Sequence, residues 1–372
     1  MSADRACWRV IDFGPRSAAE YVATNRALLE ARQQGISPNT LSFLSFSEPA
    51  ALVGFHQSVD QELRRDYCET NGITIQRRVS GGGALYVDST VLGWELYLDR
   101  KTVGSHDMLE IARRICETAA RGICELGVDA RFRPRNDIEV GGRKIAGTGG
   151  IYDGDVFLYH GSLLVDFDIE RMLRVLKIPA EKLKDKAIAS ARERVANLKE
   201  LLGEVPPTEH VIDVMTRAFA SEFGVAFERA AGMNADEERL FRIALAEVDS
   251  PEWVEQVSRP MSESRTVEGM HRSAGGLMRA ALAVDLSKER IKQVWFTGDF
   301  FVNPRRMVAD LEAALRDSPL HEYRATVGAF FDRYPVEMLL LRREDFAAAV
   351  EAAINSLAAA ESAERSDDAA AS

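Results

Sequence analysis

The sequence has few cysteines, and none is placed to build a metal site or a disulfide framework. The four are Cys7, Cys68, Cys116 and Cys124, and no two of them form a Cys-x-x-Cys pair. Zinc sites and small secreted domains usually need such closely spaced cysteines. Free thiols without a pairing pattern are typical of a reducing compartment, so we expect a cytoplasmic protein.

Long apolar segments and an excess of positive charge are also absent. No run reaches the roughly 20 apolar residues of a membrane-spanning helix, and residues 1–16 lack the basic and then apolar order of a secretory signal. The net charge of -11 repels a polyanion. We therefore expect a protein that binds neither membranes nor nucleic acids. Its 372 residues suffice for two domains.

Several catalytic motifs are missing. The chain has no Gly-x-x-x-x-Gly-Lys-Ser/Thr, which excludes a P-loop, and none of its six histidines belongs to a His-Glu-x-x-His motif. Gly-x-Ser-x-Gly, which marks many serine hydrolases, is absent too. Residues 147–152 begin like a dinucleotide-binding loop, but they lack its last glycine and follow no clear βαβ unit.

One stretch that is present organises the rest. Residues 77–88 read RRVSGGGALYVD, in which two arginines lead into a serine and three glycines. Consecutive glycines sacrifice backbone entropy, which a fold tolerates where the chain turns sharply or approaches a ligand closely. Adjacent guanidiniums favour phosphate or carboxylate as that ligand. A glycine hairpin with exposed arginines is the alternative interpretation.

Two further stretches carry chemistry. Residues 136–148 read NDIEVGGRKIAGT, which predicts a strand, a tight Gly-Gly turn and a second strand. In a regular strand Lys144 takes the face opposite to Arg143 and Ile145; it is either a fixed charge directed at a ligand or a solvated hairpin lysine. A strand over residues 157–165 contains His160 and Gly161. A glycine inside a strand often marks close approach by a ligand or another backbone.

Periodicity predicts the remaining elements coarsely. Ser17 and Glu20 fit a capping box that begins a helix over residues 17–33. We expect a single helix over residues 59–71 and a single long strand over residues 84–98. The predicted domains are a catalytic domain over residues 1–248 and an accessory domain over residues 249–357, made of a strand pair and three helices. Residues 358–372, rich in alanine, serine and acidic residues, are expected to be disordered.

The three chemical stretches together resemble the lipoate-protein ligase A family, whose catalytic fold is shared with biotin protein ligases. Residues 77–88 are similar to the family's glycine loop, residues 136–147 to its Asn-Asp and Gly-x-Lys element, and residues 160–164 to its His-Gly-Thr-Leu-Leu strand. Residues 186–198 resemble a fourth motif, and residues 54–57 resemble a fifth more weakly. The resemblance implies an α+β fold: a catalytic domain with mixed, mostly antiparallel sheets flanked by helices, and a small α+β accessory domain.

The resemblance also implies a two-step reaction. Lipoate and ATP form lipoyl-AMP and pyrophosphate, and the lipoyl group then passes to a lysine of an acceptor protein. Lys144 is the implied catalytic residue, and Asp137 would hold Mg2+ or a ribose hydroxyl. ATP with its ion and lipoate are substrates, and no cofactor is expected to stay bound. The residues implied to bind substrate and adenylate are Arg78, Ser80, Gly81, Gly82, Gly83, Ala84, Tyr86, Asn136, Asp137, Gly147, Thr148, His160 and Gly161, with His56, Gln57 and Arg77 as further candidates.

The partner implied by the resemblance is a lipoyl-acceptor protein, and the enzyme is expected to be a monomer. The acceptor would be a lipoyl domain, an H-like protein or a specialised lipoate-binding protein. Acceptors of this kind are often acidic around the target lysine, so docking would use a basic surface. The candidates for it, which are equally well explained as a solvated helix face, are Lys182, Lys184, Lys186, Arg192 and Arg194.

The sequence departs from the family's pattern at Val87, where relatives have a histidine. Three other functions stay open. An octanoyl transferase of the same fold moves an acyl group between carrier proteins without ATP and uses a cysteine shortly before the Asn-Asp strand. Residues 128–134 contain no cysteine, and Cys124 lies further upstream in a predicted helix. The others are a non-catalytic acyl-binding protein and, more remotely, a biotin ligase.

Overall fold

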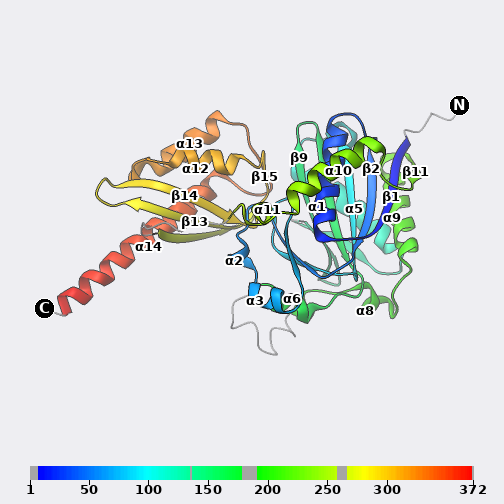
Figure 1. Cartoon of the computed structure of the whole chain (residues 1–372), viewed down its shortest axis with the longest axis horizontal. Coiled ribbons are helices and arrows are strands. Elements are labelled where there is room, and N and C mark those ends of the chain that lie inside the picture. Colours follow the sequence, from blue (N-terminus) through cyan, green and yellow to red (C-terminus); the bar gives the residue numbers. More distant parts are fainter. Residues whose placement is uncertain (1–6, 135, 178–190, 258–265, 371–372) are drawn as a thin grey trace. The chain divides into compact units, whose positions relative to one another are not determined.

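The computed structural model describes residues 7–134, 136–177, 191–257 and 266–370. Contacts divide the chain into two units (Figure 1). The first comprises Met1–Phe55, Val59–Ser80 and Ala84–Gln256, and the second comprises His56–Ser58, Gly81–Gly83 and Val257–Ser372. The division after Gln256 differs from the boundary expected after residue 248, because helix α11 (Pro251–Glu255) packs on α10 and β4 of the first unit.

An eight-stranded mixed sheet forms the centre of the first unit. Its strands β11, β1 and β2 pair in parallel, and the pairs from β2 to β7 are antiparallel. This mixed, mostly antiparallel arrangement with flanking helices confirms the predicted fold class. In spatial order the strands are β11 (Ala226–Ala230), β1 (Cys7–Arg16), β2 (Thr40–Phe46), β6 (Val91–Asp99), β10 (Val156–Leu164), β9 (Arg143–Asp153), β8 (Asp137–Val140) and β7 (Ala130–Arg133).

Helices cover both faces of this sheet. On one face α5 (Met108–Cys124) packs against α9 (Thr208–Phe223), and on the other α1 (Ala18–Gln33) packs against α10 (Ala235–Val248) (Figure 1). The capping box predicted for α1 is confirmed: the Glu20 N–H donates to the Ser17 hydroxyl, and the Ser17 N–H donates to the Glu20 carboxylate. α1 therefore begins where the sequence indicates.

A second, three-stranded sheet has the order β4 (Thr74–Arg77), β3 (Ala50–Val53) and β5 (Leu85–Val87). The single strand predicted over residues 84–98 is wrong, because the chain turns after β5 and enters the large sheet as β6. The Asp88 carboxylate accepts the Thr90 N–H at 2.9 Å and so stabilises that turn. The helix predicted over residues 59–71 is also two pieces, α2 (Val59–Glu62) and α3 (Arg65–Thr70). The remaining short helices of this unit are α4 (Arg100–Val103), α6 (Ile169–Val175) and α8 (Leu198–Leu202).

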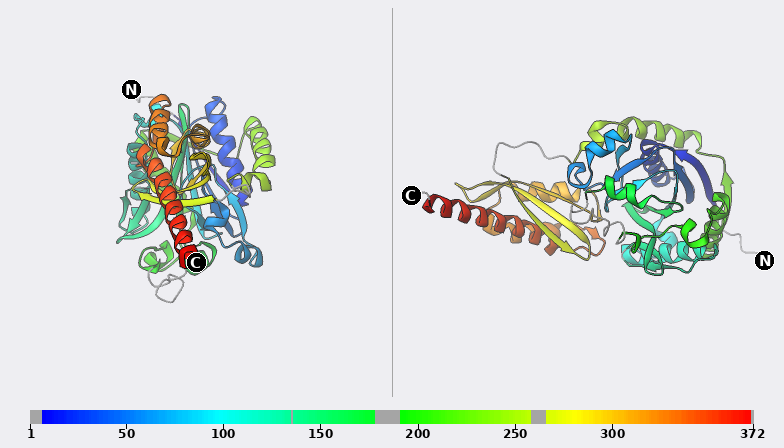
Figure 2. Two further views of the ribbon diagram at one scale, coloured as in Figure 1. Left: turned by 90° about the vertical axis from the view of Figure 1, so that its left-hand side faces the viewer. Right: turned by 90° about the horizontal axis from the view of Figure 1, so that it is seen from below.

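The second unit is a three-stranded antiparallel sheet with helices packed on it. Helix α14 (Arg343–Ala370) lies along β12 and β13 (Figure 2). The sequence predicted the central strand pair but missed β12, and residues 358–370 continue α14 instead of being disordered, as alanine strongly favours helix. The other elements are β12 (Thr266–Ser273), β13 (Gly276–Asp285), β14 (Arg290–Gly298), β15 (Val302–Asn303), α12 (Met307–Leu315), the 3-10 helix η2 (Leu320–Glu322), α13 (Tyr323–Arg333) and β16 (Glu337–Met338).

Among the described residues, no helix is both long enough and apolar enough to cross a lipid bilayer.

Candidate active site

Lys144 is held at the start of β9 by backbone contacts on both sides. The preceding turn uses Gly141 and Gly142 at φ values of 58° and 80°, the left-handed region that the Gly-Gly pair predicts. The Lys144 N–H donates to the Arg194 carbonyl at 2.7 Å, and the Lys144 carbonyl accepts the Ala196 N–H at 2.9 Å. Arg194 and Ala196, at the described end of the fourth sequence motif, thus fix the backbone of this lysine.

A β-bulge decides which way Lys144 points. Ile138 pairs with Ala146 whereas Glu139 pairs with Lys144, so Ile145 is an extra residue in β9. In a regular strand Lys144 would share a face with Thr148. The bulge turns it instead to the face of Gly147, where a Cβ atom would lie 2.8 Å from the Lys144 Nζ. Gly147 therefore leaves the space through which the lysine side chain passes.

The Lys144 ammonium forms an ion pair with Asp137. Its Nζ lies 2.8 Å from Oδ1 of Asp137. Oδ2 of the same carboxylate accepts a hydrogen bond from Nη2 of Arg133, also at 2.8 Å. Burial would raise the pKa of Asp137, but Lys144 and Arg133 outweigh it and hold that pKa below its usual value. Asp137 is therefore ionised and orients the ammonium; sequence reasoning missed Arg133, whose only signal was its spacing of four residues from Asp137.

Directly paired residues point to the same face of an antiparallel sheet. One row of such pairs runs across four strands as Asp137, Gly147, Ser162 and Gly93. The next row on that face runs through Gly149, His160, Glu95 and Ser42. Two residues along a strand span about 7 Å. Lys144 and His160 are therefore brought to one face, which we call the lysine face.

Ser80 and His160 form the second constellation on the lysine face. The Ser80 hydroxyl and His160 Nε2 are 2.7 Å apart and both side chains are buried. Burial, with a contribution from the Arg78 guanidinium, lowers the pKa of His160 to about 3, so its imidazole is neutral at pH 7. Arg78 is itself buried and donates to the Leu52 carbonyl at 2.9 Å. Three of the predicted residues are thus brought together.

Several other predicted residues have structural contacts instead. The fully buried Arg77 guanidinium donates to the carbonyls of Gly54, Phe55 and Val254. Arg77 therefore links three backbone segments, and the structure does not direct it to the lysine face.

Thr148 and Gly161 belong to the face opposite to Lys144. The Thr148 hydroxyl donates to the Asn136 carbonyl at 2.8 Å and lies 2.9 Å from the Tyr159 hydroxyl. Asn136 in turn donates its side-chain amide to the Thr148 carbonyl. A Cβ at Gly161 would lie 2.4 Å from the Trp94 ring. Asn136 and Thr148 hold neighbouring strands together through these hydrogen bonds. Gly161, where we expected a ligand or another backbone to approach closely, is instead approached by the indole ring of Trp94.

Tyr86 and Val87 are part of the first unit's core. The Tyr86 hydroxyl donates to the Asp88 carboxylate at 3.0 Å, and Val87 is 2% exposed within an apolar cluster. Ala84 packs against the same cluster. Val87 therefore fills an apolar position of the core.

The glycine triplet and two of the candidate residues belong to the second unit by their contacts. The Gly82 N–H donates to the Phe300 carbonyl at 3.3 Å, and a Cβ at Gly81 would lie 2.2 Å from that oxygen. The His56 ring stacks on Phe300 with centroids 5.0 Å apart, and Gln57, its neighbour, is 2% exposed. The glycines predicted a sharp turn or a close approach to an anionic ligand, whereas the close neighbour of Gly81 and Gly82 in the structure is the Phe300 carbonyl oxygen.

Asp137 does not fit the proposed role of a Mg2+ ligand. Both of its carboxylate oxygens are engaged by cations, Oδ1 by Lys144 and Oδ2 by Arg133. Mg2+ at a nucleotide is held by one or two carboxylates together with phosphates and waters, so it would have to displace one of these cations from Asp137. We therefore derive no catalytic step through a metal held by Asp137.

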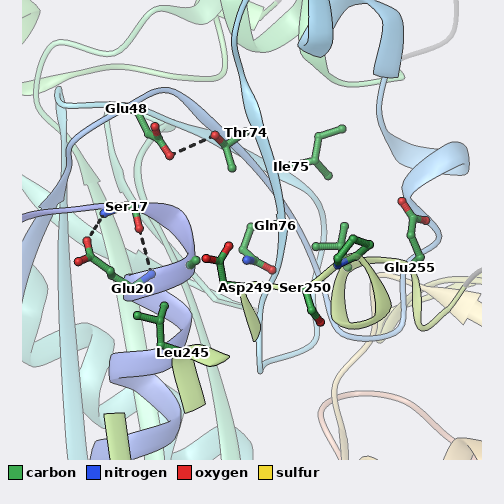
Figure 3. A pocket seen from close by; sticks show the side chains of 13 residues that line it. Ser17, Glu20, Glu48, Thr74, Ile75, Gln76, Leu245, Asp249, Ser250 and Glu255 are labelled. Atoms are coloured by element: carbon green, nitrogen blue, oxygen red, sulfur yellow. Dashed lines mark hydrogen bonds between the residues drawn. The ribbon is translucent and has the colours of Figure 1, made fainter. Parts of the chain in front are cut away.

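Neither of two surface cavities described by residues of the first unit is lined by a predicted substrate-binding residue. One, of about 630 Å3, lies between the start of α1, strand β4 and the junction of α10 with α11 (Figure 3). The other, of about 600 Å3, includes Arg192, which pairs with Glu170 at 2.9 Å. Of the other candidates for a basic docking surface, Arg194 accepts the Lys144 N–H with its carbonyl, and Lys182, Lys184 and Lys186 lie outside the described residues.

Similarity to known proteins covers the part of the chain that contains these residues. The model of the lipoyl protein ligase A/B catalytic domain matches residues 17–220, more than half of the chain. The lipoate-protein ligase LplJ of Bacillus subtilis is 33% identical over 186 residues, 50% of this chain and 55% of that protein. The octanoyltransferase LipM of Kyrpidia tusciae is 26% identical over 268 residues, 66% of this chain and 97% of that protein. The chain thus matches only about half the length of that ligase.

Solved structures give the same picture. A bipartite lipoate protein ligase from Thermoplasma acidophilum, studied with its E2 lipoyl domain, has a TM-score of 0.62 at 27% identity and covers 68% of this chain and 97% of its own. A lipoate-protein ligase A bound with ATP has a TM-score of 0.60 at 25% identity, over 67% and 99%. The chain therefore belongs to the lipoyl protein ligase A/B catalytic domain family.

Proposed function

We propose that the protein is an ATP-dependent lipoate-protein ligase. In the first step a lipoate carboxylate oxygen attacks the α-phosphorus of ATP, and the bond to the bridging oxygen breaks to release pyrophosphate. In the second step a neutral lysine amine of the acceptor attacks the lipoyl carbonyl carbon. AMP leaves as the carbonyl–oxygen bond breaks, and the nitrogen loses one proton to form the amide. Both steps build negative charge on oxygen atoms.

Lys144 supplies the charge that these steps need. Its ammonium is fixed by the ion pair with Asp137, by the bulge at Ile145 and by the space at Gly147. A donor held in place before the reaction stabilises developing oxyanion charge without reorganising, an effect of about 3 to 4 kcal/mol per donor. The side chain is 31% exposed, so a bound substrate can reach it.

Ser80 and His160 hold the carboxyl end of the acyl substrate in this proposal. A neutral imidazole paired with a hydroxyl offers hydrogen bonds without adding a second negative charge beside the attacking carboxylate. Arg78 contributes positive potential from beneath. The lysine face thus offers cations and polar hydrogens, which suit a carboxylate and a phosphate.

The observation that favours a ligase over an octanoyl transferase is the state of the cysteines. A transferase of this fold needs a thiolate nucleophile. Cys116 is fully buried on the face opposite to Lys144, and burial raises its pKa to about 11. Cys68 is fully buried too, and the Cys124 thiol donates to the Ala130 carbonyl. None of these three thiols has the features of an activated nucleophile.

Similar proteins support ATP, lipoate and a lipoyl domain as the substrates of this proposal. One relative is named a lipoate-protein ligase, one similar structure was solved with ATP, and another was studied with an E2 lipoyl domain. We infer that this chain uses ATP and lipoate and that its acceptor is a lipoyl domain or a protein of similar shape.

The test is the modification of a purified lipoyl domain by the purified full-length protein. We expect lipoylation, followed by mass spectrometry, to require ATP and free lipoate and to release pyrophosphate. Prior treatment with iodoacetamide, or the variant Cys124→Ser, should leave the rate unchanged. Transfer from an octanoyl carrier protein without ATP, abolished by iodoacetamide, would instead identify a transferase.

A further inference from the structure

Arg133 extends the lysine face by one strand. It ends β7, the last strand in the order of the large sheet, and it pairs directly with Asp137 on β8. Because directly paired residues share a face, Arg133 continues the row that runs from Asp137 through Gly147 to Ser162. Arg133 belongs to none of the sequence motifs, so its presence beside the Lys144 site needs a physical reason.

The Arg133 guanidinium binds two carboxylates and one carbonyl. Its Nη2 atom donates to Oδ2 of Asp137 at 2.8 Å, and its Nη1 atom lies 3.1 Å from Oε2 of Glu139 and 3.4 Å from the Gly142 carbonyl oxygen. Glu139 lies on β8, and Gly142 belongs to the turn that precedes Lys144. A guanidinium presents its donors in a rigid fork, whereas an ammonium is a point charge. Arg133 therefore ties β8 to the turn at the base of Lys144.

Net charge does not explain Arg133. The charges of Lys144 and Asp137 sum to zero, and so do those of Arg133 and Glu139, so the four side chains together are neutral. Stability does not explain it either, because Arg133 is 40% exposed and ion pairs at the surface contribute little. What Arg133 supplies is a fixed place for the Asp137 carboxylate.

The Lys144 ammonium has to serve two anions. It pairs with Asp137 at 2.8 Å, and in the proposed reaction it must also contact an oxygen of the substrates. A carboxylate held by this ammonium alone would follow its movement or draw it back. Arg133 occupies the second oxygen of that carboxylate, and Glu139 holds the other end of the guanidinium. Asp137 therefore keeps its position when the ammonium shifts toward a substrate.

We propose that Arg133 is a positioning residue for adenylation: anchored by Glu139, it holds Asp137 in place while Lys144 engages the substrates. It acts through Asp137 and touches no substrate itself. The proposal rests on the proposed ligase function. Misplacing a catalytic group by about 1 Å costs roughly a hundredfold in rate, so partial release of the carboxylate should cost roughly tenfold.

Arg133→Met removes the charge and keeps most of the stem of the side chain. It should lower the kcat of pyrophosphate release roughly tenfold, with unchanged KM values for ATP and lipoate and an unchanged melting temperature. Arg133→Lys should recover part of the loss, because an ammonium can still bind one oxygen of Asp137. Arg131→Met is the matched control. Arg131 lies on the same strand and face, is 74% exposed and pairs with Asp129 at 2.8 Å, so its loss should leave kcat unchanged.

Glu139→Gln separates positioning from direct contact with the nucleotide. If Glu139 anchors Arg133, this variant should lower kcat by a smaller factor than Arg133→Met does. If Arg133 instead contacted the phosphates, removing the negative charge of Glu139 would lower the KM for ATP. A lower KM for ATP in E139Q, or a higher KM for ATP in R133M, would therefore overturn the positioning role.

A titration of Asp137 tests the arrangement without catalysis. Against the effect of burial, Lys144 and then Arg133 hold the pKa of Asp137 below its usual value. The other groups that matter are Glu139, which pairs with Arg133, and the Cys116 thiol, which stays neutral because burial raises its pKa to about 11. The carbon-13 signal of the Asp137 carboxyl, assigned by its absence in D137N, should show a higher pKa in R133M than in wild type or R131M. The acid limb of the kcat profile should move to higher pH with it.

An unchanged Asp137 pKa in R133M, or a kcat of R133M equal to that of the wild type, would overturn the proposal. A wild type that releases no pyrophosphate would refute the ligase and with it the role of Arg133 in adenylation. The titration would then still report whether Arg133 holds the Asp137 carboxylate, so the two failures are distinguishable.

Discussion

Lys144 and Asp137 form an ion pair 2.8 Å long between the two strands of one hairpin. The pair joins the Lys144 ammonium to a carboxylate that Arg133 binds from its other side. Its position depends on a one-residue bulge at Ile145 and on the missing side chain of Gly147. We infer that this arrangement positions the ammonium before the substrates arrive.

Asp137→Asn should lower the rate of adenylation roughly tenfold to a hundredfold. The amide cannot hold the ammonium as the carboxylate does, and a catalytic group misplaced by about 1 Å loses rate on that scale. The effect should fall mainly on kcat in a pyrophosphate-release assay. Asp129→Asn, which breaks an exposed 2.8 Å ion pair with Arg131 nearby, is the control and should have no effect. Equal rates for wild type and D137N would remove Asp137 from the mechanism.

Gly147→Ala should displace Lys144 without unfolding the protein. The new methyl group would lie 2.8 Å from Nζ and 2.9 Å from Cε, closer than carbon and nitrogen atoms tolerate, and the flexible lysine would move first. We expect a loss of activity of about a hundredfold at an unchanged melting temperature. Gly232→Ala, which meets no atom within 4 Å, should be neutral in both measurements. Full activity in G147A would contradict the assigned path of the lysine side chain.

His160 should make the protein less stable as the pH falls below 6.5. The unfolded chain binds a proton near pH 6.5, whereas the folded chain does not until about pH 3, so protons favour the unfolded state in that window. The free energy of unfolding of the wild type should therefore fall, relative to that of His160→Gln, by up to about 1.4 kcal/mol for each pH unit below 6.5.

Denaturant unfolding of both proteins between pH 4 and 8 measures this difference. The comparison with H160Q is needed because Glu95, whose pKa is raised to about 8, acts in the opposite direction as it loses its proton. His210→Gln, at an exposed position of α9, should keep the wild-type slope. A pH-independent difference between wild type and H160Q would mean that His160 is not buried in its neutral form.

Trp253→Phe should loosen the segment that leads into the glycine loop. The Trp253 Nε1–H donates to the Arg77 carbonyl at 2.9 Å, while the Arg77 guanidinium donates to the Val254 carbonyl. Phenylalanine keeps an aromatic ring against Arg26 and removes only the indole N–H donor. The lost hydrogen bond contributes about 1 kcal/mol to the free energy of unfolding. Hydrogen exchange of the amides of residues 77–79 should become faster, and Trp295→Phe in the second unit should leave it unchanged. Unaltered exchange in W253F would show that α11 does not brace this segment.

Much of the fold could be predicted from local patterns. The capping box of Ser17 and Glu20 and the Gly141–Gly142 turn were correct because both depend on residues adjacent in the sequence. The split of residues 84–98 into β5 and β6 was missed because apolar residues flank the turn closely on both sides, and only the three polar residues Asp88, Ser89 and Thr90 mark it. Local periodicity cannot tell one long strand from two that join different sheets.

The candidate site was predicted in its residue types and only partly in its geometry. Lys144, Asp137, Ser80 and His160 were selected, and the structure brings them to one face. Thr148 was selected through the family resemblance, and the bulge at Ile145 puts it on the face opposite to Lys144. Arg77 was taken as a candidate for the ligand, but a buried guanidinium binds backbone carbonyls equally well, and sequence cannot distinguish the two partners.

The role of Lys144 can be measured directly by pyrophosphate release from ATP in the presence of free lipoate. Lys144→Met keeps the stem of the side chain and removes its charge, and we predict a loss of at least about a hundredfold, with folding verified by an unchanged melting temperature. Arg143→Met, which removes the neighbouring cation that pairs with Glu200 at 2.6 Å, should keep the wild-type rate. Release by K144M at the wild-type rate would contradict the account that Lys144 stabilises the charge of adenylation.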